Sequence, residues 1–329
     1  LRTASFQAIV GLSPPGEPQA LARHMQEMGG PEEKLIAEYI VAKKDSVVKN
    51  LGVRYFSACF RWKSGAPGYL IWNDTPPKER KVPFVELKTT SQFYWNANLS
   101  NARFQSTDQS MSNISLGCKH GCEALLDTGT SLIAVPPETY ADALLELNSL
   151  DTDCTNLHSM PNLVFELGGH QFSLPPQTYI GVIEGPVVQS VKDLLSFTPP
   201  TRPIACRLLL MNSGVLGKNM WILGQPFFRY YYTTFDLGEG YKREGRRIWA
   251  APASAECYPT DHSRFVRRFD HAKLQRPWRI NGTMIQPPER RGWPDKRVYG
   301  PPEPDEEVNN TADDLAAPWS NTRRVWQFQ

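Results

Sequence analysis

The stretch EALLDTGTSLI, residues 123–133, decides the fold of this chain. An apolar run leads to one carboxylate, a Thr-Gly-Thr-Ser turn follows it, and apolar residues then resume. This pattern predicts a buried strand that carries Asp127 to a tight turn. Gly129 permits a close backbone approach that a side chain would block.

Asp127 is a candidate functional residue because an ionisable group between two apolar segments is costly to bury without hydrogen bonds. The hydroxyl groups of Thr128, Thr130 and Ser131 can donate such bonds to the carboxylate or to the carbonyl groups of the turn. The tripeptide Asp-Thr-Gly alone is a common turn in which the Asp only caps the backbone. The choice between these interpretations therefore depends on the longer run, residues 124–133.

The composition is that of a globular protein of one large or two ordinary domains. The chain has 329 residues, of which 40% are hydrophobic and 21% charged, and a formal net charge of +2. The near-neutral charge gives no indication of a nucleic-acid partner. No apolar run reaches roughly 18 residues, so we expect no membrane span in this chain. Because the chain opens on Leu1 within a pattern, we interpret it as a fragment or processed product.

The six cysteines indicate disulfides and an oxidising compartment. Three residues separate Cys118 from Cys122, and no second Cys or His pair stands at metal-ligand spacing. We therefore predict a small disulfide loop there and no metal site. Sequons for N-glycosylation agree with a secretory protein; they begin at Asn73, Asn98, Asn113, Asn281 and Asn309.

The remaining patterns predict β-hairpins and few helices. Residues 136–147 begin with proline and carry acidic residues early, which is typical of a helix; its apolar stripe would be Tyr140, Ala143, Leu144 and Leu147. Residues 18–50 also have helical spacings. Gly168-Gly169 lies between two apolar runs and predicts a hairpin turn. In the β-rich stretch 55–62, we expect Cys59 to be a buried free thiol.

Taken in order along the chain, these motifs resemble the pepsin-like aspartic proteases. Residues 124–133 resemble the second catalytic loop of that family. Residues 220–236 resemble its Trp-Ile-Leu-Gly segment, short helix and Tyr-Tyr-Thr-X-Phe-Asp strand, and residues 160–180 resemble its Pro-Pro hairpin series. The resemblance covers about residues 1–253. It implies a mainly β fold, the C-terminal lobe of a bilobal acid protease with a few short helices.

The resemblance also implies a division of the chain. Residues 1–50 would hold the end of the N-terminal lobe, with a closing strand at 6–12, and the connection between lobes. Residues 51–257 would form the C-terminal pepsin-like lobe. Residues 258–329 are rich in Pro and Arg without sustained periodicity, so we expect a disordered tail.

The family resemblance implies two disulfides and a cleft. Cys154 stands where the family begins a disulfide and Cys206 is its natural partner, so we expect Cys154–Cys206 beside Cys118–Cys122. Cys59 and Cys257 are left over, and other pairings remain open. Tyr94 resembles a family residue that borders the substrate cleft, although a core aromatic is an equal alternative. Ile222 would pack beside the Asp127 loop at the cleft, and Gly224 would let the crossing backbone pass close.

The resemblance implies hydrolysis of peptide bonds by two carboxylates that share one proton across a water molecule, without a cofactor. Asp127 would supply one carboxylate. Thr128 and Thr130 would support it by hydrogen bonding. The chain contains no second Asp-Thr-Gly and no Asp-Ser-Gly. We therefore expect an inactive chain whose parent protein is an aspartic endopeptidase.

The implied partners are protein or peptide substrates and the missing N-terminal lobe. The expected location is the secretory pathway, either extracellular or in an acidic vacuole or lysosome-like compartment. Two alternatives remain open. The chain could be a non-catalytic lobe that binds proteins, or two copies could pair so that each gives one Asp127.

Overall fold

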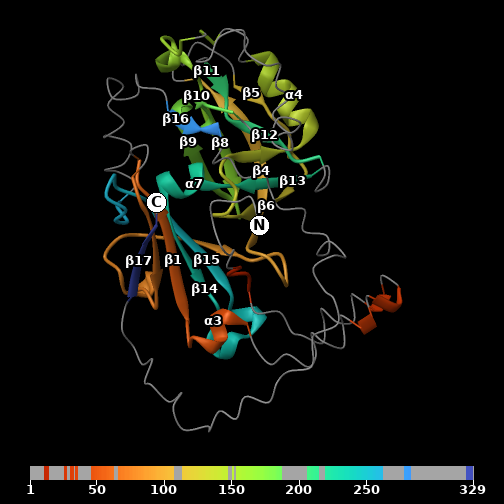
Figure 1. Cartoon of the computed structure of the whole chain (residues 1–329), viewed down its shortest axis with the longest axis vertical. Helices are drawn as coiled ribbons and strands as arrows, with labels where there is room; N and C mark the ends of the chain where they lie inside the picture. Colours follow the sequence, from red (N-terminus) through yellow and green to blue (C-terminus); the bar gives the residue numbers. More distant parts are fainter. Residues whose placement is uncertain are drawn as a thin grey trace.

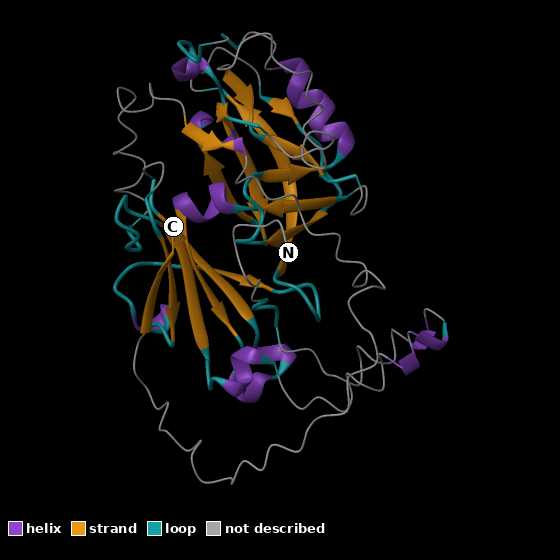
Figure 2. Cartoon of the chain, viewed as in Figure 1, coloured by secondary structure: helices purple, strands orange, loops and turns teal. Residues whose placement is uncertain are grey.

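The computed structural model contains mainly β-strands and a few short helices, as the sequence predicts (Figures 1 and 2). In the part of the chain that the structure describes, the strands form one sheet of eight, one of six and one of three. No helix in the described part of the chain is long and apolar enough to cross a membrane. The structure describes residues 11–14, 26–27, 30–32, 34–35, 46–62, 66–106, 113–146, 150–151, 153–186, 206–214, 219–261, 278–282 and 324–328.

The eight-stranded sheet contains the strand that leads to Asp127. In this sheet β13 lies between β6 and β7, parallel to the first and antiparallel to the second. The consecutive strands β6 and β7 are therefore separated by β13 in the sheet. Its strands are β4 (Asn96–Gln105), β5 (Ile114–Ser115), β6 (Cys122–Leu126), β7 (Ile133–Val135), β8 (Asn162–Leu167), β9 (His170–Leu174), β12 (Leu210–Asn212) and β13 (Met220–Leu223).

The six-stranded sheet is antiparallel and forms a second body, below the first in Figure 1. The three-stranded sheet lies beside the eight-stranded one. The six-stranded sheet comprises β1 (Tyr55–Phe60), β2 (Gly68–Trp72), β3 (Val85–Lys88), β14 (Tyr231–Asp236), β15 (Arg247–Pro252) and β17 (Arg324–Phe328). The small sheet comprises β10 (Ile180–Glu184), β11 (Cys206–Leu208) and β16 (Trp278–Asn281).

The helices among the described residues that can be given bounds are short. They are α3 (Val47–Asn50), α4 (Pro137–Glu146), α5 (Pro176–Tyr179) and α7 (Gln225–Tyr230), and the 3₁₀ turns η1 (Pro77–Glu79), η2 (Leu157–Ser159), η3 (Glu239–Tyr241) and η4 (Arg243–Gly245). The predicted strand at 6–12 and most of the predicted helical region 18–50 lie outside the described residues.

The predicted helix at 136–147 is α4, but its predicted apolar stripe is partly wrong. Tyr140 and Ala143 are buried, whereas Leu144 is 44% exposed. The residues of α4 that are buried lie along one narrow edge, and Leu144 follows Ala143 by about 100° around the helix axis. Its side chain therefore reaches solvent. Leu147 lies outside the described residues.

The predicted hairpin at Gly168-Gly169 is confirmed, since β8 and β9 pair across it. The two glycines have positive φ angles of 56° and 85°, which a two-residue hairpin turn requires.

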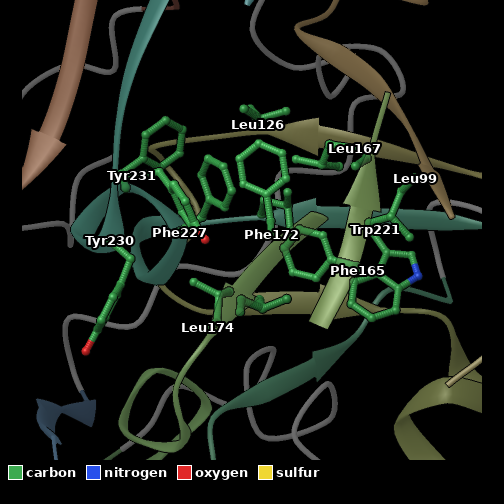
Figure 3. Packing of buried hydrophobic residues seen from close by; sticks show 14 of the residues in the cluster. Leu99, Leu126, Phe165, Leu167, Phe172, Leu174, Trp221, Phe227, Tyr230 and Tyr231 are labelled. Carbon is green, nitrogen blue, oxygen red and sulfur yellow. The ribbon is translucent and has the colours of Figure 1, made fainter. Parts of the chain in front are cut away.

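An aromatic core contains side chains from both large sheets and from α7 (Figure 3). Tyr231 of β14 lies 4.9 Å from both Phe172 and Phe227, measured between ring centroids.

The prediction that Cys59 is a free thiol is wrong, because Cys59 forms a disulfide with Cys257. Cys59 lies on β1, and Cys257 follows β15, which pairs with the β1 neighbour β14. The fold therefore returns the chain to β1 after 198 residues. No local pattern in the sequence could report a contact over that separation.

Removing the Cys59–Cys257 disulfide is expected to lower the free energy of unfolding by about 5 kcal/mol, because a cross-link over so long a loop restricts the unfolded chain strongly. The matched control removes Cys118–Cys122, whose sequence separation is 4. The same relation gives about 2 kcal/mol for that short loop. Denaturant unfolding of the two double Cys→Ala variants checks the order. Equal losses would contradict it.

Within residues 258–329, where we expect a disordered tail, two short segments form strands. β16 pairs in parallel with β10, and β17 pairs antiparallel with β2. Both strands complete the edge of a sheet through backbone hydrogen bonds, which need no apolar periodicity in the sequence. The rest of this region beyond residue 261 lies outside the described residues, apart from Gly282.

Candidate active site

Asp127 lies at the end of β6, in the turn that leads to β7. Its backbone N–H donates a hydrogen bond to the carbonyl oxygen of Leu223 at 3.1 Å, which extends the ladder between β6 and β13 by one residue. The N–H of Thr130 donates to the carbonyl oxygen of Asp127 at 3.2 Å and closes the turn. The side chain of Asp127 is half-buried. The turn therefore presents a carboxylate at the end of a buried strand.

Both carboxylate oxygens of Asp127 accept hydrogen bonds from the same turn. The Gly129 N–H donates to Oδ1 at 3.0 Å, and the Thr130 hydroxyl donates to Oδ2 at 2.9 Å. Thr130 is fully buried, so its hydroxyl is fixed in place. Of the other predicted supports, Thr128 is half-buried and Ser131 is buried. The donors from Gly129 and Thr130 orient the carboxylate.

Gly224 lies where the backbone that follows β13 crosses the Asp127 turn. The Gln225 N–H donates to the carbonyl oxygen of Thr130 at 2.8 Å. A Cβ atom on Gly224 would lie 2.0 Å from the carbonyl oxygen of Leu132 and 2.3 Å from that of Thr130. The predicted close crossing at Gly224 is thus confirmed. The backbone at Gly224 packs against the turn that connects the buried strands β6 and β7.

The small disulfide loop lies directly before β6. Cys118 and Cys122 are bonded, and Cys122 is the first residue of that strand. Cys154 and Cys206 are bonded as well, which are the two pairs that the family resemblance implied. The loop therefore anchors the start of the strand whose other end carries Asp127.

A small apolar cluster lies on the face of the sheet where the Asp127 side chain is expected. Leu126 and Leu223 point into the main core, whereas Leu125 and Ile222 belong to the other cluster. Side chains alternate along a strand, so Asp127 shares a face with Leu125. We call this the Asp127-side cluster: Leu125, Leu132, Ala134, Ile183, Leu209, Met211 and Ile222, with Tyr94, Met220 and Ile280 packed against it.

The structure brings the two predicted cleft residues together in the Asp127-side cluster. Tyr94 is half-buried there. Ile222 is only 1% exposed, so its side chain does not line an open surface in this structure. Ile280 of β16 packs against the same cluster. Sequence reasoning missed Ile280, because it lies in the region expected to be disordered.

A second buried carboxylate, Asp74, serves a different purpose. Its oxygens accept hydrogen bonds from Ser57 at 2.6 Å and Tyr232 at 2.5 Å, and Arg80 pairs with it at 2.5 Å. Burial, and then the nearby Asp74 charge, raise the pKa of Tyr232, which therefore stays a donor. Asp74 is enclosed and neutralised, so we assign it to stabilisation of the six-stranded sheet.

No group of three or more His, Cys, Asp or Glu side chains within the described ranges is arranged to hold a metal ion. The Asp127 turn combines a carboxylate, the donors that hold it and the apolar surface beside it. A carboxylate held in this way can act as an acid or a base toward a water molecule or a carbonyl group.

Comparison with known proteins agrees with the sequence motifs. The family model described as "Eukaryotic aspartyl protease" matches residues 43–242. Gastricsin of Homo sapiens is 35% identical over 129 residues, which are 37% of this chain and 29% of gastricsin. Chymosin of Ovis aries is 27% identical over 244 residues, 70% of this chain and 56% of chymosin. The chain thus spans about half the length, or less, of these curated relatives.

Proposed function

Because the chain belongs to the eukaryotic aspartyl protease family, we propose that Asp127 is one of two carboxylates that together hydrolyse peptide bonds in protein substrates. The observation that carries this proposal is the turn itself. A half-buried carboxylate ends a buried strand, and donors from Gly129 and Thr130 hold both of its oxygens. Such a group is oriented without being enclosed.

The proposed chemistry needs a second carboxylate within reach of the first. Two like charges at short distance cannot both ionise, so the pair holds one proton between them. One member then takes a proton from the attacking water while the other gives a proton to the peptide carbonyl oxygen. The pair titrates as a unit, which favours acidic conditions.

We further propose that residues 51–257 form one lobe, that residues 1–50 hold the end of an N-terminal lobe and the connection between lobes, and that the N-terminal lobe supplies the second carboxylate. The support is that the 329 residues contain one Asp-Thr-Gly and no Asp-Ser-Gly. The three disulfides support folding in an oxidising compartment of the secretory pathway.

The purified 329-residue chain is accordingly expected to be inactive. Incubated with a denatured protein at acid pH, it should release no more peptide than its Asp127→Asn variant. Mass spectrometry of the products measures this. Cleavage that Asp127→Asn abolishes would show that the chain completes a carboxylate pair on its own. Sedimentation would then show whether two copies pair to do so.

Replacing Thr130 by Val is expected to lower kcat/KM about 10-fold to 100-fold in the full-length gene product that carries these residues. The change removes one hydrogen bond to a charged group. Thr139→Val is the control, because Thr139 is a buried threonine whose hydroxyl donates to Leu116 instead.

A non-catalytic lobe that binds proteins is the second candidate function. The single Asp-Thr-Gly and the covered Asp127-side cluster favour it. It predicts that the full-length gene product also fails to cleave denatured protein at acid pH, whereas the first proposal predicts cleavage.

A further inference from the structure

A segment far along the chain returns to the Asp127 side of the molecule. β16 lies parallel to β10, with Gly181 opposite Trp278 and Glu184 opposite Asn281 (Figure 1, blue). β11 pairs with the other edge of β10. β16 therefore occupies the remaining edge of β10 through backbone pairing, as an added strand.

The side chains of β16 divide between the two sides of the strand. Ile280 packs against the Asp127-side cluster, which includes Leu125 and Ile222. The neighbouring Arg279 is exposed and donates a hydrogen bond from Nη1 to Oε1 of Glu184 at 2.5 Å. An extended peptide added to the edge of a sheet is recognised in this way, because backbone bonds hold it while alternate side chains enter pockets.

The covered cluster lies beside the proposed catalytic carboxylate. Leu125 precedes Asp127 by two residues, and Leu132 follows it by five, so both ends of the active-site turn contribute to the cluster. Tyr94 packs against the same cluster from outside the turn. A peptide bound beside Asp127 on this face would compete with Ile280 for the same apolar surface.

We propose that the edge of β10 and the Asp127-side cluster form a binding surface for an extended peptide in which a basic residue precedes an aliphatic one, and that Trp278–Asn281 is its resident occupant. That such a peptide could be a substrate rests on the proposed function. The occupancy itself rests on the pairing of β16, the packing of Ile280 and the Arg279–Glu184 ion pair. A tethered segment acts at an effective concentration of about a millimolar, so modest contacts can hold it in place.

The test uses the full chain and a fluorescein-labelled peptide that repeats residues 275–283. The parent chain is expected to bind it weakly, because its own segment holds the surface. Ile280→Asp in the chain places a charge against the apolar cluster and should release the segment. If the segment occupies the surface nine-tenths of the time, the peptide should bind about tenfold more tightly to this variant. Fluorescence polarisation measures both affinities.

Matched controls separate release of the segment from general damage. Tyr258→Asp is the same kind of change at a side chain that is 66% exposed, and should leave peptide binding as in the parent. Arg279→Glu in the chain should improve peptide binding by roughly threefold, as expected for an exposed ion pair. Glu184→Arg added to it should restore the pair, and with it the protection of the amides of residues 278–281 in hydrogen exchange. These two charge substitutions change side chains at the surface, so they still test the proposal if the Ile280→Asp chain does not fold.

Equal peptide affinity of the parent, Ile280→Asp and Arg279→Glu chains would overturn the proposal, as would no binding to any of them. Hydrogen exchange is the second measurement. The amides of residues 278–281 should lose protection in Ile280→Asp, or in Arg279→Glu if Ile280→Asp does not fold. Unchanged protection would also overturn the proposal. Neither measurement depends on catalysis. If the peptide binds the released chain while the full-length gene product cleaves nothing, only the proposed function fails.

Discussion

Replacing Asp127 by Asn is expected to lower kcat/KM for a protein substrate by about 10³-fold or more in the full-length gene product, the loss typical of a removed acid–base group. The amide has the shape of the carboxylate but cannot ionise or share a proton. kcat should fall with kcat/KM, because the lost interaction acts in the transition state. Initial rates of peptide release at acid pH measure both constants.

Asp142→Asn is the matched control for this substitution. Asp142 is an exposed residue of α4, and the same loss of charge there should leave the rate within about twofold of the parent. Both variants should melt within a few degrees of the parent. An Asp127→Asn protein that keeps the activity of the parent would remove Asp127 from the catalytic pair.

Replacing Gly224 by Ala is expected to lower the free energy of unfolding by more than about 4 kcal/mol, or to prevent folding, which places it among the rare severe substitutions. The added Cβ would lie 2.0 Å from one backbone carbonyl oxygen and 2.3 Å from another. Backbone atoms between two buried strands cannot move aside as a flexible side chain can. Denaturant unfolding measures the effect, and soluble yield measures it where the variant does not fold.

Two other glycines separate the effect of a steric clash from the effect of backbone strain. An alanine at Gly11 would meet nothing within 4 Å, so Gly11→Ala should change stability by no more than about 0.5 kcal/mol. Gly169 is equally open but has a φ of +85°, so Gly169→Ala should cost about 1–2 kcal/mol through backbone strain alone. A Gly224→Ala protein as stable as Gly11→Ala would contradict the close crossing.

The local features of the fold were predictable because each depends on neighbours in the chain. The Asp127 turn, the α4 helix and the Gly168-Gly169 hairpin all depend on residues within a few positions of one another. The same holds for the Cys118–Cys122 loop. Turn geometry, helix capping and strand alternation act over that range, and the sequence therefore reports them directly.

Features built from distant segments were not predictable in the same way. The Cys59–Cys257 disulfide joins residues 198 positions apart. β16 and β17 come from a region without apolar periodicity, and they are held by backbone pairing to the edges of β10 and β2. Backbone hydrogen bonds carry little side-chain signature, so composition alone predicted disorder there.

The sequence by itself determined that a carboxylate with its own donors ends a buried strand, and that the chain resembles the pepsin-like proteases. Only the tertiary structure decided what surrounds that carboxylate. It inserts β13 between β6 and β7, brings Gly224 against the Asp127 turn and packs Ile280 of a distant segment against the cluster that contains Ile222. The physical reason is the sequence separation between the residues that interact. Turn chemistry is encoded among neighbouring residues, whereas the surroundings of Asp127 come from segments that meet only when the whole chain packs.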